Sequence, residues 1–139
     1  MSAGFILKQL ETPRLRLRQL LADDARQLVL LRNDERVNRY LDRPKSTSYE
    51  QAVGFIERVL SNRAYYWAIN LKHETKLIGT ICLWNFDNVN STVEIGYELL
   101  PDFQGQGLMA EALRSVINFN STDLQFDTIK GITHTGNTS

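Results

Sequence analysis

The sequence contains little cysteine or histidine and no excess of charge of either sign. The only cysteine, Cys82, excludes a disulfide within the chain and is typical of a reducing compartment, so we expect a cytoplasmic protein. The two histidines, His73 and His134, are far apart and match no metal-ligand spacing, so we expect no metal. Sixteen basic residues balance sixteen acidic ones, whereas nucleic-acid-binding proteins usually carry a basic excess. We therefore expect no nucleic-acid partner.

Long apolar runs are also missing. No stretch approaches the roughly 20 apolar residues that span a bilayer, and the first four residues lack the basic start of a signal peptide. We therefore expect no membrane partner. The 139 residues are 42% hydrophobic, which is enough for one core, and they contain no repeats or linkers. The composition thus predicts a single domain.

Hydrophobic periodicity predicts an α/β fold. Strands are indicated where apolar residues alternate with polar ones, and helices where apolar residues recur at three- and four-residue spacing. The expected elements are a strand at 14–19, a helix beginning near 23, a helix at 34–42, a helix beginning after Ser48, strands at 65–71, 77–84 and 92–99, a helix at 105–119 and a strand at 127–134. The three central strands form an antiparallel meander, and the helix at 105–119 is a crossover between parallel strands.

The crossover helix is expected to bury one apolar stripe. The residues expected to face inward are Leu108, Met109, Ala112, Leu113, Val116 and Ile117. Glu111 and Arg114 are expected to face water. In the first strand Arg14, Arg16 and Arg18 alternate with leucines, which favours a solvated, charged face.

Two glycines, Gly105 and Gly107, lie where a strand turns into the crossover helix. A helix start presents unpaired N–H groups and the positive end of the helix dipole, and glycines let the backbone approach a bulky anion. The segment is therefore a candidate phosphate cradle, with a simple tight turn as the alternative. It lacks the three glycines of a dinucleotide fold and the Gly-Lys-Ser/Thr ending of a nucleotide-binding loop.

This region resembles a known family. Its sequence Gln104-Gly105-Gln106-Gly107-Leu108-Met109 is similar to the acyl-CoA signature Gln/Arg-x-x-Gly-x-Gly/Ala of the GNAT N-acetyltransferase superfamily. Three further segments resemble the branch of this superfamily that acetylates ribosomal-protein N-termini. They are Glu94-Ile95-Gly96-Tyr97, Glu111-Ala112-Leu113 and Thr12-Pro13-Arg14-Leu15-Arg16-Leu17-Arg18. The match covers nearly the whole chain. Met109 departs from the pattern, and we expect the helix direction to aim its side chain at the sheet.

The resemblance implies a GNAT-like mixed sheet, with an antiparallel meander and one parallel crossover, and acetyl-CoA as co-substrate. The loop amides expected to hold its pyrophosphate are those of Gln104, Gly105, Gln106, Gly107, Leu108, Met109 and Ala110. The backbone of Leu99 and Leu100 is expected to bond the pantetheine amides, where a bulge in this strand splays it from its neighbour. Asn137 is expected to touch the cofactor arm, or else to be a turn residue.

Acyl transfer to an amine benefits from a base, because a free alkylamine has a pKa of about 10. The resemblance assigns this role to Glu94, with an ordinary solvent-facing carboxylate as the alternative. The family's acceptor pocket implies roles for Tyr40, Trp84 and Asn85, and core packing is the alternative for the two aromatic residues. Cys82 is expected to be packed and not reactive, and no general acid is identified.

The expected function is transfer of an acetyl group from acetyl-CoA to a primary amine by direct attack in a ternary complex. A protein N-terminus, polyamines, amino acids and aminoglycosides all stay open as acceptors. The alternatives are a non-catalytic acyl-CoA-binding module or inactive fragment, and a binder of another phosphorylated ligand. The resemblance implies a further helix and two strands, so residues 1–139 are interpreted as one acetyltransferase-like domain that is incomplete at its C-terminus. A homodimer or another second chain is one way to complete the sheet.

Overall fold

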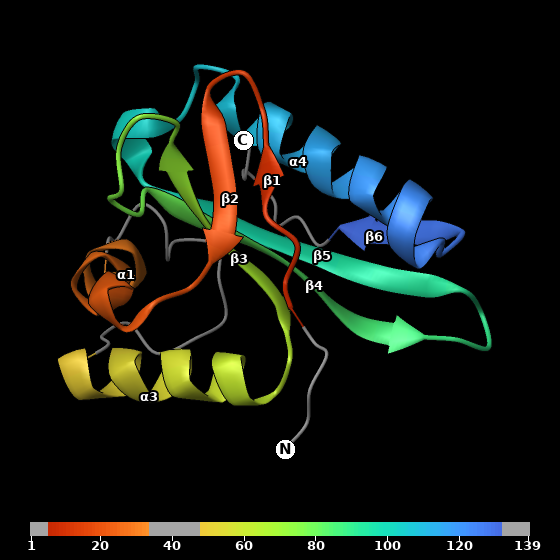
Figure 1. Ribbon diagram of the computed structural model, residues 1–139, viewed down its shortest axis with the longest axis horizontal. Coiled ribbons are helices and arrows are strands. Elements are labelled where there is room, and N and C mark those ends of the chain that lie inside the picture. Colours follow the sequence, from red (N-terminus) through yellow and green to blue (C-terminus); the bar gives the residue numbers. More distant parts are fainter. Residues whose placement is uncertain (1–5, 34–47, 132–139) are drawn as a thin grey trace.

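The computed structural model describes residues 6–33 and 48–131, which form a mixed sheet covered by helices on both faces (Figure 1). In spatial as in chain order the strands are β1 (Leu10–Glu11), β2 (Leu15–Gln19), β3 (Tyr65–Leu71), β4 (Gly79–Asp87), β5 (Thr92–Leu99) and β6 (Thr128–Gly131). Neighbouring strands are antiparallel except β5 and β6, which are parallel. The expected meander and parallel crossover are confirmed.

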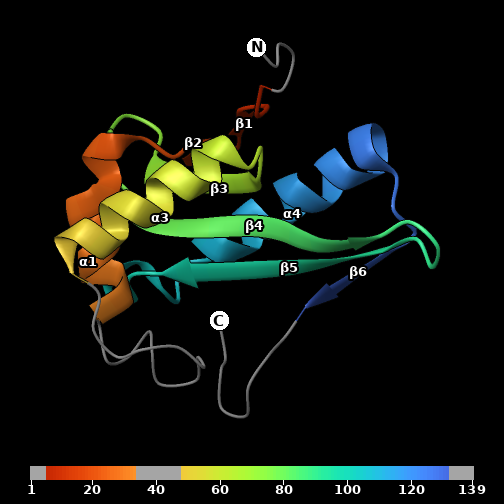
Figure 2. The same ribbon diagram turned by 90° about the horizontal axis from the view of Figure 1, so that it is seen from below.

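The described helices are α1 (Ala25–Asn33), α3 (Tyr49–Ser61) and α4 (Leu108–Phe119). α4 packs against one face of the sheet, and α1 and α3 pack together on the other (Figures 1 and 2). Alternation along β3 supplies both cores, since Trp67 and Ile69 face α4 while Ala68 faces α1 and α3. None of the described helices is long and apolar enough to cross a bilayer.

Local signals in the sequence explain where the helices begin. The Ser48 hydroxyl accepts a hydrogen bond from Gln51 N–H (3.1 Å), and the Gln51 side chain accepts one from Ser48 N–H (2.8 Å). This reciprocal cap confirms the predicted start of α3. Before α1, Leu21 N–H donates to the Asp24 carboxylate (2.7 Å) at a 3₁₀ turn over Ala22–Asp24. The predicted helix at 34–42 lies outside the described residues.

The strand predicted at 77–84 is shifted in the structure, because β4 begins at Gly79 and continues to Asp87. At Gly79 the chain passes so close to β5 that a Cβ would lie 2.4 Å from the Glu98 carbonyl oxygen. Further along, Asn85 adopts a positive φ of 54°, and the register with β5 shifts between Trp84 and Asp87. This irregularity lets the strand continue through residues predicted as a loop. The two-residue β1 was not predicted.

Two burial predictions for α4 are wrong. Ile117 was expected in the core, but 47% of its surface is exposed, because the stripe that faces the sheet is narrower than expected. Glu111 was expected to face water but is buried. Arg114 is exposed, as predicted.

Candidate functional site

The loop between β5 and α4 consists of a 3₁₀ turn, Pro101–Phe103, followed by the glycine pair. Gly105 and Gly107 have φ angles of +76° and +79°, in the left-handed region that favours glycine. A Cβ at position 105 would meet nothing within 4 Å, so this part of the loop faces open space. A Cβ at position 107 would lie 3.3 Å from Nη2 of Arg14.

The start of α4 presents donors that the helix itself does not use. α4 begins at Leu108, three residues later than predicted, because Gly107 occupies the N-cap position with left-handed geometry. The bond from Glu111 N–H to Gly107 O (3.1 Å) opens the helical pattern, so the N–H groups of residues 108–110 have no acceptor within the helix. With no capping side chain at Gly107 to compete, an anion can accept these bonds.

The side chains of both glutamines in the loop form hydrogen bonds with backbone carbonyls that precede them in the chain. Gln104 Nε2 donates to the Leu99 carbonyl (2.8 Å), and Gln106 Nε2 donates to the Asp102 carbonyl (3.1 Å). Leu100 N–H donates to the Ile78 carbonyl (2.9 Å). The backbone groups expected to meet pantetheine therefore already have partners, although a carbonyl oxygen can accept a second hydrogen bond.

Met109 does not crowd the loop. Its side chain is buried in the core between α4 and the sheet, together with that of Leu108. The prediction that the helix direction aims Met109 at the sheet is confirmed.

The bulge expected in β5 lies in β4 in the described pairings. Trp84 pairs with Glu94 and Asp87 pairs with Thr92, so two residues of β4 lie opposite one residue of β5. β5 pairs with β6 from Thr92 to Ile95, and the described part of β6 ends at Gly131, opposite Ile95. Among the described residues, the last pair between these strands is therefore that of Ile95 with Gly131.

Three of the predicted site residues meet at the hairpin of β4 and β5. Trp84 is the cross-strand partner of Glu94, and the Asn85 side chain donates a hydrogen bond to the Glu94 carboxylate. Trp84 is 47% exposed, so the core-packing alternative for this residue is wrong. Its indole nitrogen would lie 3.8 Å from a Cβ at Gly96, which places the ring along β5 beside Glu94. Tyr40 and Asn137 lie outside the described residues.

The glycine loop and Glu94 lie at opposite ends of one strand. Five residues of extended chain separate Glu94 from Leu99, about 17 Å at 3.4 Å per residue. A ligand that contacts both must therefore be long, with an anionic group at one end.

A cluster that sequence reasoning missed lies behind the loop. The buried Glu111 carboxylate accepts hydrogen bonds from the Thr12 hydroxyl (2.6 Å), from Arg14 N–H (3.2 Å) and from Arg14 Nε. Burial acts to raise the pKa of Glu111, but the hydrogen bonds from Thr12 and Arg14 outweigh it and lower the pKa below 4.5. The signal in the sequence was an acid placed in the first turn of a helix whose start is predicted to bind an anion.

The solvated face expected for the arginines of the first strand is also wrong in part. Arg18 is mostly buried and pairs with the Asp24 carboxylate through both terminal nitrogens, at 2.8 and 2.9 Å. Its Nε donates to the Asn70 side chain (2.7 Å). Arg16 lies 3.6 Å from a Glu11 oxygen. Asp24 thus both starts a helix and anchors it to β2.

Other chemistries find little support among the described residues. Burial raises the pKa of the Cys82 thiol to about 11, which supports the prediction that it is packed and not a reactive thiolate. Burial likewise raises the pKa of Tyr66 to about 12. No group of three or more His, Cys, Asp or Glu side chains within 6–33 and 48–131 could hold a metal ion.

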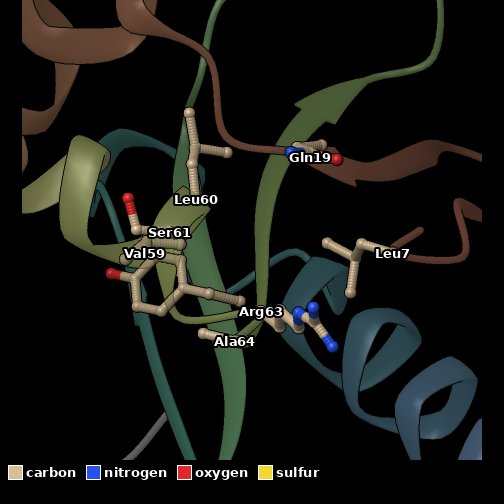
Figure 3. Close-up of a pocket in the computed structure, with 8 residues that line it drawn as sticks. Leu7, Gln19, Val59, Leu60, Ser61, Arg63 and Ala64 are labelled. Atoms are coloured by element: carbon tan, nitrogen blue, oxygen red, sulfur yellow. The ribbon is translucent and has the colours of Figure 1, made fainter. Parts of the chain in front are cut away.

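The surface formed by residues 6–33 and 48–131 includes two hollows of interest. One, of about 400 Å³, borders the glycine loop and is lined by Pro13, Arg14, Leu71, Lys72, His73, Glu74, Asp102, Phe103, Gln106 and Leu108. The other, of about 210 Å³, is lined by Leu7, Gln19, Val59, Leu60, Ser61, Arg63, Ala64 and Tyr66 (Figure 3). None of the predicted site residues lines the second hollow, whereas Gln106 and Leu108 line the first.

Comparisons with known proteins agree with this geometry. Residues 14–139 match the model of the acetyltransferase (GNAT) domain family. The chain is 30% identical over 132 residues to the uncharacterised N-acetyltransferase YoaA of Bacillus subtilis (strain 168), covering 92% of this chain and 75% of the relative. Over 60 residues it is 37% identical to the ribosomal-protein-serine acetyltransferase of Escherichia coli (strain K12), covering 43% and 34%.

A solved structure supports the same fold. Spermidine N-acetyltransferase from Vibrio cholerae, in complex with CoA and spermine, superposes with a TM-score of 0.75 at 19% identity, covering 86% of this chain and 71% of that one. At this identity the likeness concerns the arrangement of strands and helices alone.

Proposed function

Because the chain belongs to the GNAT acetyltransferase family, and is thus an acetyl-CoA-dependent acetyltransferase, we propose that its glycine loop binds the diphosphate of acetyl-CoA and that Glu94 is the general base. The acceptor is a primary amine, carried by a small molecule or a peptide. The amine attacks the thioester carbonyl directly while both substrates are bound, so that a C–N bond forms, the C–S bond breaks and coenzyme A leaves as its thiolate. The single cysteine fits a cytoplasmic enzyme.

The observation that carries the proposal is the backbone conformation of the glycine loop and its unused N–H donors. Its glycines hold left-handed geometry, position 105 faces open space, and the first amides of α4 have no helical acceptor. These features fit a bulky anion that is held by main-chain donors alone, such as a diphosphate. When bound, acetyl-CoA supplies the activated acetyl thioester. The backbone of Leu99 and Leu100, between the loop and Glu94, would hold its extended arm, and Asn137 is the proposed further contact.

The hairpin end of the site has the groups that an amine requires. Asn85 orients the Glu94 carboxylate by a hydrogen bond, and the exposed indole of Trp84 lies beside it. A carboxylate and an indole face both attract a cationic amine. Glu94 then takes the proton that the attacking nitrogen releases, directly or through water. Tyr40 is proposed to complete the acceptor pocket.

The choice of a primary amine follows from the family and from the site. Among the similar proteins, one is named for spermidine and another for a ribosomal protein. Within the described residues, Glu94, Trp84 and Asn85 form no dense acidic cluster of the kind a polyamine would favour. We therefore propose only the reacting group, and leave its carrier to a substrate panel of peptides and polyamines.

The test combines binding with turnover. Coenzyme A should shift the amide resonances of residues 104–110, and Glu94→Gln should keep this binding but lose turnover on the amine panel by about 10²- to 10⁴-fold. Glu57→Gln, which changes an exposed carboxylate on α3, is the matched control and should keep full turnover.

The two parts of the proposal fail separately. If the amides of 104–110 do not move at saturating coenzyme A in a folded sample, the loop does not bind the diphosphate. If Glu94→Gln turns over like the wild type, Glu94 is not the base. Binding without turnover in both proteins would favour a non-catalytic acyl-CoA-binding module.

A further inference from the structure

Glu111 stands at a place where a free carboxylate would oppose anion binding. It lies in the first turn of α4, directly behind the amides proposed to hold the diphosphate. Its carboxylate is buried and accepts hydrogen bonds from Thr12 and Arg14, which precede β2. The Arg14 guanidinium thus neutralises a negative charge that would otherwise repel the ligand.

The same guanidinium reaches the glycine loop. While Nε of Arg14 donates to Glu111, Nη1 donates to the Gln106 carbonyl (3.0 Å), and Nη2 would lie 3.3 Å from a Cβ placed at Gly107. Two nitrogens of one planar group therefore tie the helix and the loop to each other. Arginine is suited to this task because its donors form a rigid fork, which a lysine ammonium lacks.

The hydrogen bond to Gln106 also sets the direction of a donor. In a trans peptide the C=O of one residue and the N–H of the next point in opposite directions, and no described peptide is cis. Because Arg14 holds the Gln106 carbonyl on its own side, the N–H of Gly107 points to the opposite side of the loop. That N–H is one of the amides proposed to grip the diphosphate.

The segment that carries Arg14 is itself anchored. Lys72 N–H donates to the Arg14 carbonyl (2.9 Å), and the Lys72 side chain donates to the Thr12 carbonyl (3.0 Å). The Thr12 hydroxyl in turn accepts from Leu15 N–H (2.9 Å). The turn before β2 is therefore held by the sheet and acts as a fixed base for the guanidinium.

We propose that Arg14 and Glu111 form a clamp that orients the glycine loop and so sets the affinity for the diphosphate of acetyl-CoA. Both are positioning residues, since they act through the loop and not on the reacting atoms. The inference rests on the proposed function, because it concerns the same loop and the same ligand. A role only in packing the turn before β2 against α4 is the rival explanation.

A ligand without the diphosphate separates the two explanations. Coenzyme A and S-acetylpantetheine share the pantetheine arm, but the second lacks the diphosphate and nucleotide. Binding of each is measured by the shifts of amide resonances, which report millimolar as well as micromolar dissociation constants. The variants are Arg14→Met, Arg14→Lys and Glu111→Gln. Arg16→Met is the matched control, because Arg16 lies two residues further along the chain, in β2, and pairs with Glu11.

The clamp predicts a selective loss. Arg14→Met and Glu111→Gln should weaken coenzyme A about tenfold while S-acetylpantetheine changes less than twofold, and Arg16→Met should change neither. Arg14→Lys should behave like Arg14→Met, because one ammonium does not reproduce the fork. Equal weakening of both ligands, unchanged binding of coenzyme A, or wild-type behaviour of Arg14→Lys would each overturn the clamp.

The outcomes also distinguish this inference from the proposed function. If the wild type binds coenzyme A and the clamp variants bind it equally well, only the clamp is lost. If the folded wild type does not bind coenzyme A, both ideas fail together. Glu111 is buried, so Glu111→Gln carries a risk to folding, but the Arg14 side chain is 48% exposed and the Arg14 variants decide the matter alone.

Discussion

The carboxyl group of Glu111 links the pH of the solution to the stability of the fold. Burial opposes its ionisation, yet the bonds from Thr12 and Arg14 lower its pKa below 4.5. The folded chain therefore holds this proton less tightly than the unfolded chain. Its contribution to the free energy of unfolding is complete above pH 4.5 and is lost as the pH falls through the folded pKa.

The substitution Glu111→Gln should remove the part of the pH dependence of stability that comes from this carboxyl group. We expect the difference in unfolding free energy between wild type and variant to be largest at pH 6 and to shrink towards pH 3, since the wild-type group becomes protonated. Urea denaturation at several pH values measures it. Glu57→Gln, on the exposed side of α3, provides the control. A difference that is constant with pH would contradict the assignment.

A second prediction for a single residue concerns Asp24. It pairs with Arg18 through two hydrogen bonds, and the side chains are only 7% and 13% exposed. Removing one partner of a buried pair leaves the other charge uncompensated, so Asp24→Asn should destabilise the fold by about 3–5 kcal/mol. The neighbouring Asp23 is exposed, and Asp23→Asn should change stability by no more than about 0.5 kcal/mol. Equal effects in urea denaturation would refute the difference.

At the residue scale, the sequence predicted the backbone conformation of single residues better than it predicted which side chains form hydrogen bonds with each other. The need for glycine at 105 and 107 and the cap at Ser48 follow from local chemistry, and they were predicted. The bond between Thr12 and Glu111 joins residues 99 positions apart. In the sequence Arg14 and Arg16 look alike, and only the fold brings one of them to the loop.

The elements differ in how strongly the sequence defines their ends. The bounds of β3 and β5 were predicted as observed. β3 is an aromatic and β-branched run closed by a polar turn, and β5 alternates between two faces before Pro101. α4 begins late because the left-handed geometry of Gly107 excludes it from the helix. β4 is displaced because its close approach to β5 and the irregularity near Asn85 depend on a neighbouring strand. Such tertiary effects are not visible in the pattern.

Two glycine substitutions with opposite expected effects on stability test whether the loop before α4 requires a left-handed residue. Gly105→Ala forces a side chain into left-handed geometry, so it should destabilise by about 1–2 kcal/mol although the space is open. Gly54→Ala, inside α3, places a Cβ in ordinary contact 3.5 Å from Arg58 and should stabilise by about 0.5–1 kcal/mol. Thermal and urea denaturation measure both. A neutral Gly105→Ala would mean that the loop does not require its left-handed residue.

At the scale of the whole molecule, the described residues form two cores that share one sheet. The core under α4 and the core under α1 and α3 meet through alternate residues of β3. The chain spans about three quarters of the length of its relative YoaA. Even so, the described residues contain both cores and the complete loop. We therefore expect ligand binding at one end of β5 to stabilise both layers together.

Ligand linkage tests this expectation. At 100 times its dissociation constant, coenzyme A should raise the free energy of unfolding by about 2.7 kcal/mol. The increment should be the same by far-UV circular dichroism, which follows all helices, and by the fluorescence of the buried Trp67, isolated in a Trp84→Phe background. Trp67 belongs to the core under α4, whereas α1 and α3 cover the other face. An increment confined to the fluorescence transition would show that the two layers unfold independently and that the loop stabilises only its own.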